Sequence, residues 1–417
     1  MAVGLEKKEE EALNAALKPL FADLIKKEFE SPRFSFKAAL KDNVKDLAKF
    51  NEKITKDLNL DEFVNQMKHS TVLKGVVDEA EKQAAFKDVI HDFYIKLRLL
   101  RARAEFLKKL GMVGEDNDTE IWGPGRVDAF GSARAFLFQT GYRPLTPVSY
   151  PPIFELPTHD WFHYDNNTNT FLERNFGQAL GVGALWDSES KTYSLEPKNL
   201  RQLESLARKL TAPKWPEEVF GKIDQARAMR GEKLYGTYCA ECHDAAKNDK
   251  FDKLGELAEI KTDPNRATTF AAKVPPTDTP FPDMIKNTLA EIKEVALAEF
   301  TPEEQEVIKK EPVKWLGPAK YSARTTKGSW STAPFLHNGS VPTLYELLQP
   351  VSKRREKFYV GSRQYDIEKL GYLSDDKMTL FDTSKPGNSN AGHEGKEFGT
   401  QISEEERRDL LEYLKSQ

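Results

Sequence analysis

Residues 238–243 read Tyr-Cys-Ala-Glu-Cys-His, and Cys239 and Cys242 are the only two cysteines among 417 residues. The spacing Cys-x-x-Cys-His is the signature of covalent c-type haem attachment. Residues three apart share one face of a helical turn, so each thiol can reach one vinyl group of the same porphyrin and form a thioether. His243 can then donate a nitrogen to the iron as the proximal ligand. The motif therefore predicts one haem c per chain, bound by Cys239, Cys242 and His243.

Two other kinds of site also use closely spaced cysteines. A thioredoxin-like redox pair should follow a strand of a βαβ unit, whereas the residues before Cys239, Gly231-Glu-Lys-Leu-Tyr235, look helical. A structural zinc site needs four ligands, usually with a second Cys or His pair at short spacing. No such pair stands near residues 238–243. Haem attachment is therefore the favoured interpretation.

The second axial position of the iron decides what such a haem can do, and His or Met can occupy it. We predict His337 as this ligand, because it lies in a Gly- and Pro-rich loop next to the apolar Phe335 and Leu336. Met284 and Met378 are the alternatives, although both are more typical of packing residues. Two histidines would give a closed, lower-potential haem suited to electron transfer. A Met ligand would raise the potential, and an open position would allow oxygen or peroxide to bind.

The composition is that of a globular protein. Hydrophobic residues make up 39% of the chain, charged residues 31%, and the formal net charge is -4, which gives no support to nucleic-acid binding. No run of about 18 apolar residues occurs, so no membrane span is predicted. The first residues, Met-Ala-Val-Gly-Leu-Glu-Lys-Lys, lack the apolar region of a signal peptide. Because haem is attached to such motifs outside the bacterial cytoplasm, we nevertheless expect a periplasmic location.

The first half of the chain changes character at about residue 113. Residues before it are predicted to be helical, since apolar residues repeat at helical spacing over 13–25 and 86–100. From there to residue 215, Gly, Pro, Asn and aromatic residues crowd together, which is typical of functional loops. Within this stretch only 196–210 looks helical.

The second half is predicted to be a cytochrome c-like domain over residues 216–417 of a mainly α-helical protein. Helices are expected at 225–238 and near 283–299. Two more are expected after Thr343 and Ser403, where a Glu three residues later completes a capping box. The first and last helices of this domain would flank long inserted loops.

Several stretches of this sequence resemble the di-haem c-type cytochromes related to bacterial rubber oxygenase and, more distantly, the bacterial di-haem cytochrome c peroxidases. They are 122–130 (WGPGRVDAF), 172–181 (LERNFGQALG), 231–235 (GEKLY) with 239–243 (CAECH), 331–343 (STAPFLHNGSVPT) and 386–393 (PGNSNAGH). The block around His337 is the most specific. In that family its histidine is the distal ligand of the C-terminal haem, so the resemblance implies that His337 pairs with His243.

The sequence departs from this family because it carries one Cys-x-x-Cys-His motif instead of two. In rubber oxygenase the upstream haem binds oxygen, and the motif present here matches the downstream haem. The segment 12–34 resembles the stretch directly after the first haem in such proteins, so residues 1–215 are expected to be the remainder of an N-terminal haem domain. Met1 then begins inside a longer coding sequence, unless the lineage lost the first haem. In either case rubber cleavage is not carried over.

Two functions are compatible with this resemblance. The first is electron transfer through a bis-His haem c, with a redox partner protein or a second haem domain as partner. The alternative is a part of a di-haem oxygenase or peroxidase whose reactive haem lies outside this chain. Whether the chain acts as an enzyme stays open, and no catalytic residue is predicted. An open iron coordination site would distinguish the second function from the first.

Two further groups of residues could contact a haem. Residues 158–165, Thr-His-Asp-Trp-Phe-His-Tyr-Asp, concentrate aromatic and histidine side chains. Trp161 or Tyr164 could line a haem edge or an electron path, and a simple aromatic cluster is an equally good interpretation. Arg126 could bind a haem propionate, because a guanidinium suits a carboxylate, or it could pair with Asp128 in a tight turn.

The remaining histidines carry weaker signals. His393 lies in a Gly-rich loop and by the resemblance belongs to the family core, but its spacing predicts no role. His69 and His91 are predicted to be surface or helix histidines. No Ser-His-Asp grouping, phosphate loop or Glu-x-x-His metal motif stands out in the sequence.

Overall fold

The structure is a computed structural model, and it describes residues 123–138, 146–184, 186–188, 191–244, 254–274, 277–311 and 314–417. The helices expected over 13–25 and 86–100, and the histidines His69 and His91, lie outside the described residues. Apart from Asp187–Thr192, the described residues belong to one compact unit. The domain boundary predicted at residue 215 stays a prediction.

Helices carry most of the regular structure, which agrees with the mainly α class. The described α-helices are α7 (Ala129–Phe138), α8 (Phe171–Gly181), α9 (Pro197–Ala207), α10 (Glu217–Phe220), α11 (Gln225–Tyr238), α12 (Ala240–His243), α13 (Leu257–Ile260), α14 (Asn265–Ala271), α15 (Phe281–Ala296), α16 (Pro302–Lys310), α17 (Leu344–Leu347) and α18 (Glu404–Lys415). Short 3-10 turns lie at Leu156–Thr158, Leu297–Glu299, Ser329–Ser331, Val351–Lys353 and Lys396–Phe398.

The described strands are short and pair two by two. They are β1 (Arg126–Val127) with β2 (Val148–Ser149), β3 (Trp186–Asp187) with β4 (Thr192–Tyr193), β5 (Leu254–Gly255) with β8 (Tyr321–Ser322), β6 (Lys273–Val274) with β7 (Thr279–Pro280), β9 (Lys357–Val360) with β12 (Thr379–Asp382), and β10 (Tyr365–Asp366) with β11 (Gly371–Tyr372). The β9–β12 pair is antiparallel and aligns Lys357 with Asp382. Each strand pair joins two loop segments by backbone hydrogen bonds, whereas the larger apolar contacts are made by the helices.

The helices predicted from capping and periodicity form where the sequence placed them. Helices α9, α11 and α18 form where they were expected, and α15 overlaps the range near 283–299 but begins earlier, at Phe281. Ser403 and Glu406 make both bonds of the capping box in front of α18. Thr343 also caps α17, but the carboxylate of Glu346 binds Arg355 instead of the cap backbone. Helix α16 was not predicted, although Thr301 and Glu304 form a complete capping box.

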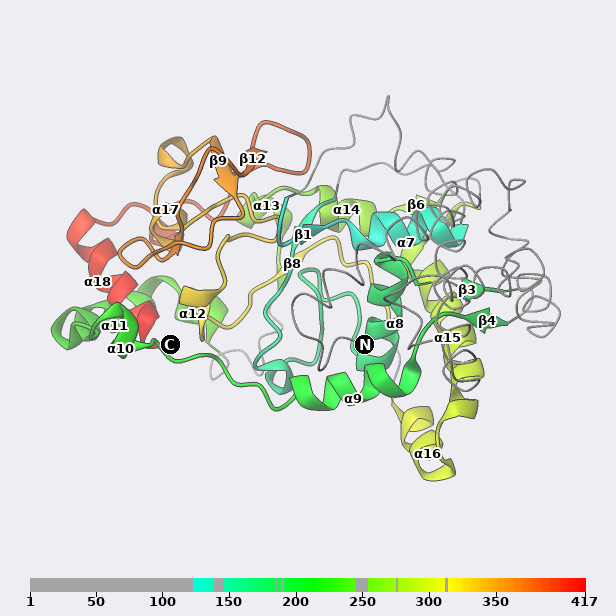
Figure 1. Cartoon of the computed structure of the whole chain (residues 1–417). Coiled ribbons are helices and arrows are strands. Elements are labelled where there is room, and N and C mark those ends of the chain that lie inside the picture. Colours follow the sequence, from blue (N-terminus) through cyan, green and yellow to red (C-terminus); the bar gives the residue numbers. More distant parts are fainter. Residues whose placement is uncertain are drawn as a thin grey trace, which may run out of the picture. The chain divides into compact units, whose positions relative to one another are not determined.

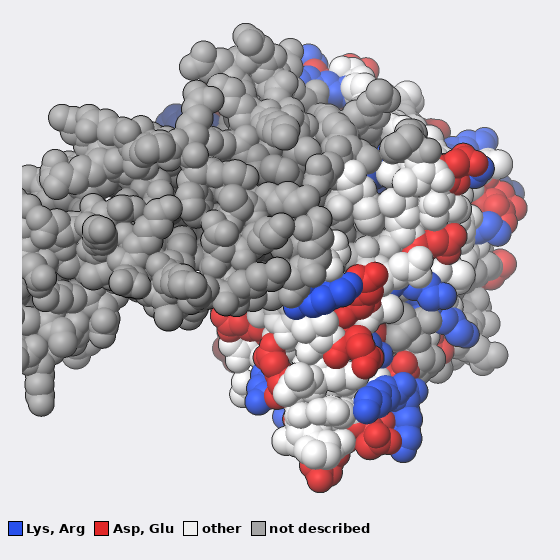
Figure 2. All heavy atoms as spheres, turned by 90° about the vertical axis from the view of Figure 1, so that its right-hand side faces the viewer, with Lys and Arg blue, Asp and Glu red and all other residues white. Residues whose placement is uncertain are grey.

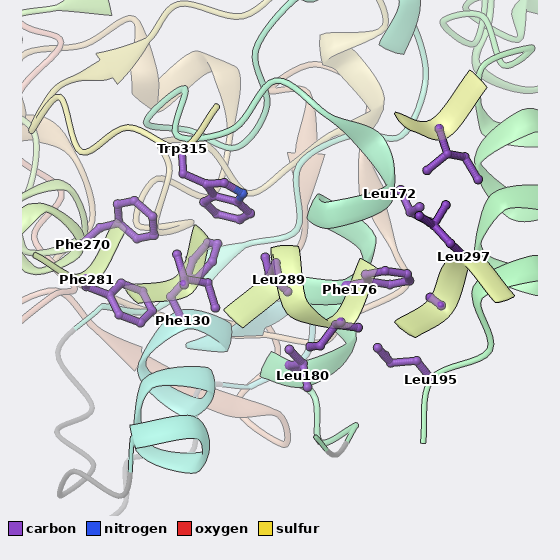
Figure 3. Packing of buried hydrophobic residues seen from close by; sticks show 14 of the residues in the cluster. Phe130, Leu172, Phe176, Leu180, Leu195, Phe270, Phe281, Leu289, Leu297 and Trp315 are labelled. Carbon is purple, nitrogen blue, oxygen red and sulfur yellow. The ribbon is translucent and has the colours of Figure 1, made fainter. Parts of the chain in front are cut away.

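Two helices, α7 and α8, form in the stretch that was expected to be dominated by loops. In α8 the buried residues Leu172, Phe176 and Leu180 are four apart and so lie on one face. They pack into a core cluster with Leu289 of α15 and with the aromatic rings shown in Figure 3. Because burial of this face stabilises the helix more than local propensity does, Gly- and aromatic-rich sequence is helical here.

Helices α11 and α18 cross at close range, one from each end of the region predicted to be cytochrome c-like (Figure 1). Gly231 lies at the crossing: a Cβ added there would stand 2.1 Å from the carbonyl oxygen of Asp409 and 2.8 Å from Cβ of Tyr413. Only glycine allows the two backbones to approach so closely. The packing of α11 on α18 therefore brings the two ends of residues 225–415 together.

The surface of the described residues mixes charges of both signs. On the face shown in Figure 2, Lys and Arg side chains alternate with Asp and Glu, and no continuous basic stripe runs over the described part. Among the described residues, no helix is long and apolar enough to cross a membrane.

Candidate haem-attachment site

Helix α11 places the two cysteines at its C-terminal end. Asp224 caps the other end, where its carboxylate accepts hydrogen bonds from two amides of the first turn. The amide of Cys239 donates to the carbonyl of Tyr235 (2.9 Å), and the amide of His243 donates to that of Cys239 (2.9 Å). The backbone thus makes one more turn through α12. Cys239 and Cys242 lie on that turn, as thioether bonds to one porphyrin require.

The thiols are free and half-buried. Cys239 packs against the apolar cluster that includes Tyr235 and Leu410. Burial, reinforced by the neighbouring Cys242, raises the pKa of the Cys239 thiol to about 12. The thiol is therefore neutral at pH 7, whereas the attacking cysteine of a dithiol redox pair has a lowered pKa. This chemistry disfavours the thioredoxin-like alternative, as does the helix that precedes the pair.

His243 is held in the tautomer that a metal ligand needs. Its Nδ1 lies 2.5 Å from the carbonyl oxygen of Arg324, and since a carbonyl can only accept, Nδ1 donates. The lone pair of the neutral ring is then on Nε2. Burial lowers the pKa of His243, which favours the neutral ring. A backbone carbonyl that fixes the far nitrogen is the usual support of a metal-bound histidine.

The structure brings His393 to His243. The two ring centroids are 6.3 Å apart, with 59° between the ring planes. The backbone of His393 has a φ of 48°, in the left-handed region that is uncommon for residues other than glycine. Its amide donates to the carbonyl of Ile260 (2.7 Å). Burial, followed by the charges of His243 and Arg354, lowers the pKa of His393 to about 3.

These residues fit a haem c. Imidazole nitrogens bind first-row metals such as zinc at about 2.0–2.1 Å, so two rings on opposite sides of one ion have centroids about 6 Å apart. The 6.3 Å between His243 and His393 agrees with this spacing. Nδ1 of His393 is also buried without a hydrogen-bond partner among the described residues. Buried polar atoms of that kind are uncommon, and a bound group would account for this one.

His337 has different neighbours. Its ring stacks on that of Tyr321 (4.1 Å between centroids), and its Nε2 is hydrogen-bonded to the Tyr321 hydroxyl (3.1 Å). That hydroxyl donates its one proton to the carbonyl of Asp263 (2.7 Å), so His337 is the donor to Tyr321. An Nε2 that carries a proton has no lone pair for a metal. His337 as second ligand stays a prediction, and the ring contact favours His393 instead.

The aromatic block at residues 158–165 is tied to His243 through Arg324. The guanidinium of Arg324 donates to the carbonyls of Trp161 (3.4 Å) and His163, while its own carbonyl accepts from His243. The hydroxyl of Tyr164 is hydrogen-bonded to Ser149 (3.0 Å). One arginine therefore links the block to His243. The sequence held no signal for this residue, because the link depends on tertiary contacts.

Arg126 and Asp128 each have partners of their own. Arg126 is buried, donates to the side-chain oxygen of Asn388 (2.7 Å) and lies over the ring of Phe381. Asp128 accepts from the amide of Gly131 (2.9 Å) at the start of α7. Burial raises the pKa of Asp128. The structure thus assigns Asp128 to a helix start, and the role of Arg126 toward a propionate stays a prediction.

Of the two methionines considered as iron ligands, one packs against the apolar core and the other is exposed. Met284 packs against the core cluster that contains Leu289, and Met378 is 42% exposed. Among the described residues, no group of three or more His, Cys, Asp or Glu side chains could hold a metal ion by itself.

Comparison with known proteins agrees with a cytochrome. Residues 320–360 match the family model described as RoxA-like, cytochrome c-like. The chain is 32% identical over 390 residues to the uncharacterised protein y4iJ of Sinorhizobium fredii, covering 76% of this chain and 65% of that protein. It is also 32% identical over 226 residues to the uncharacterised y4iM of the same organism, covering 46% of this chain and 49% of that protein. The RoxA-like match supports a c-type cytochrome that is related to RoxA and binds haem c.

Proposed function

We propose that this chain transfers electrons through one haem c, attached to Cys239 and Cys242 and ligated on its two faces by His243 and His393. The contact between the two imidazole rings carries the proposal. The two ring centroids are 6.3 Å apart, which is the spacing of a bis-histidine site, and the two thiols lie on the turn that leads to His243. The RoxA-like match supplies independent support for haem.

Haem c would supply a one-electron Fe(III)/Fe(II) couple at this site. The chain's own residues would hold it: the Arg324 carbonyl fixes the His243 ring and its tautomer, and His393 would bind the iron as the second histidine. A site closed on both faces leaves no position for an oxygen or peroxide substrate, which suits electron transfer. We also propose a periplasmic location, because thioether attachment occurs there, and a redox protein or a second haem domain as partner.

An alternative function is favoured by the RoxA-like match. In it the chain is a part of a di-haem oxygenase or peroxidase, and the reactive haem lies outside this chain. The bis-histidine haem would then feed electrons to that second haem. Both functions need the same closed site, so the state of the second axial position is the first property to measure.

The test compares two histidine variants of the full chain, exported in a bacterium that attaches haem c. We expect one haem per chain and little carbon monoxide binding by the reduced protein. His393→Ala should open the second axial position and give strong carbon monoxide binding, whereas His337→Ala should leave the site closed. The reverse pattern would identify His337 as the ligand. A colourless product from a host that matures a control cytochrome would overturn the proposal altogether.

A further inference from the structure

Arg354 is a buried arginine whose guanidinium binds only main-chain carbonyls. Its exposed fraction is 4%. It donates to the carbonyls of Asn390 (2.7 Å), Gly392 (2.8 Å) and His393 (3.0 Å). Two more hydrogen bonds, of 3.2 and 3.3 Å, go to carbonyls at the end of α17. One side chain thus joins the loop that carries His393 to a helix of the apolar core.

This arrangement is energetically unusual. Among the described residues no carboxylate forms an ion pair with Arg354, whereas its neighbour Arg355 binds Glu346 (2.5 Å). A buried charge without an opposite charge is costly, and burial lowers the pKa of Arg354 to about 10. The five carbonyls offset that cost. In turn, the guanidinium gives these carbonyls hydrogen-bond donors, which a loop carbonyl does not obtain from a helix or a sheet.

The loop at 390–393 has a conformation that needs such support. Gly392 has a φ of 84°, and a Cβ added there would stand 2.3 Å from the carbonyl oxygen of Ile260 and 2.3 Å from the amide nitrogen of Thr262. The next residue, His393, is also in the left-handed region, at a φ of 48°. For a residue with a side chain, such as His393, backbone in this region persists only where surrounding contacts hold it.

We propose that Arg354 is the positioning residue of His393: its guanidinium fixes the 390–393 loop so that the imidazole faces His243. Arg354 does not touch the proposed iron position and acts through the loop. The inference rests on the proposed function, since it assumes that His393 is the second axial ligand. Arg354 is not one of the proposed haem-binding residues, so the inference goes beyond them.

Carbon monoxide affinity measures this role directly. Carbon monoxide binds only when His393 has left the iron, so its apparent affinity scales with the fraction of open sites. Arg354→Met removes the hydrogen bonds that hold the loop, and we expect the affinity of the reduced protein to rise about tenfold or more. Arg354→Lys keeps the charge but offers one nitrogen instead of a planar fork, and should give an intermediate value.

Arg407→Met is the matched control. Arg407 is also buried, at 8% exposed, and donates to the carbonyls of Leu348 (3.0 Å) and Ile402 (3.2 Å). Its loss should lower stability as a buried arginine does, and leave carbon monoxide affinity unchanged. Equal affinities in the Arg354→Met and Arg407→Met variants would overturn the positioning role.

His393→Ala separates the failure of the ligand assignment from the failure of the positioning role. If that variant does not bind carbon monoxide more tightly than wild type, the proposed function fails, whatever Arg354 does. If it does, and the Arg354 variants remain closed, only the positioning role fails. Should Arg354→Met yield no folded holoprotein, Arg354→Lys decides alone, and a wild-type affinity in it would refute the inference.

Discussion

His243 and His337 both have lowered pKa values, yet their hydrogen bonds leave different ring nitrogens with a lone pair. A carbonyl accepts from Nδ1 of His243, so Nε2 keeps its lone pair. A tyrosine hydroxyl whose proton is already donated elsewhere accepts from Nε2 of His337. At the scale of single residues, the hydrogen-bond partner of one ring nitrogen therefore decides which nitrogen of that histidine keeps a lone pair for a metal.

A second feature at the scale of single residues is the carboxylate of Asp382, whose ionisation should stabilise the fold. Hydrogen bonds from Ser384 and from Lys357 (2.9 Å) lower the pKa of Asp382 to about 2. Because the folded pKa lies below the ordinary value of 3.8, the ionised carboxylate stabilises the fold above that value. This contribution is lost as pH falls through about 2.

Asp382→Asn should therefore be less stable than wild type at neutral pH and approach it near pH 2. Urea unfolding followed by circular dichroism at pH 7, 4, 3 and 2 would measure the difference. Lys357→Met should show a smaller effect of the same kind, since the Ser384 bonds remain. A difference between Asp382→Asn and wild type that is the same at all four pH values would contradict the assignment.

At the scale of elements, the crossing of α11 and α18 determines where the cysteines lie. Helix α11 ends at Tyr238, directly before Cys239, so any shift of this helix moves the attachment site. The crossing is fixed by the missing side chain of Gly231 and by Arg230, which binds both oxygens of Asp409 (2.7 and 2.8 Å). The packing of α11 against α18 therefore determines the position of the Cys-x-x-Cys-His motif.

Gly231→Ala should destabilise the protein by about 1–3 kcal/mol, because the new Cβ meets the backbone of α18 and cannot be accommodated by a rotamer change. Gly236→Ala is the matched control in the same helix. Nothing lies within 4 Å of a Cβ at Gly236, so this variant should gain about 0.5–1 kcal/mol from helix propensity. Chemical unfolding of both proteins checks the pair, and equal effects would show that the crossing is looser than described.

At the scale of the whole described unit, the proposed haem site gathers segments far apart along the chain. Cys239, Cys242 and His243 come after α11, the carbonyl of Arg324 comes after β8, and His393 lies in a loop before α18. The apolar cluster beneath Cys239 includes Trp215, Leu344 and Leu410, which come from three further segments. A haem held by both histidines would therefore cross-link several segments of the fold.

Loss of haem should lower the thermal midpoint of the whole protein. The bond from His393 to iron exists only in the folded state, so it stabilises by linkage. We expect Cys239→Ala/Cys242→Ala to unfold about 2–4 °C lower for a difference of roughly 2–3 kcal/mol. Wild-type chain made in the cytoplasm, where haem is not attached, controls for loss of the thiols. Equal midpoints for holoprotein and both haem-free proteins would argue against ligation across the fold.

Local patterns predicted much of the regular structure. Capping boxes placed the start of α18, and periodicity placed α9, α11 and α15. Helices α7 and α8 were not expected, because their stability depends on tertiary packing: α8 buries the face of Leu172, Phe176 and Leu180, and α7 packs against α8. The Thr301–Glu304 capping box shows that a signal for α16 was present in the sequence.

By itself the sequence predicts the attachment chemistry, since the spacing of Cys239, Cys242 and His243 is a property of one helical turn. Only the tertiary structure brings a second imidazole, that of His393, close to His243. His337 and His393 are both distant from the motif along the chain, and each stands in a Gly-rich loop with no helical or strand period to orient its side chain. Their directions depend on long-range hydrogen bonds, to Tyr321 for His337 and from Arg354 for the loop of His393. Such contacts form only when the chain is folded, so no local pattern could have distinguished the two.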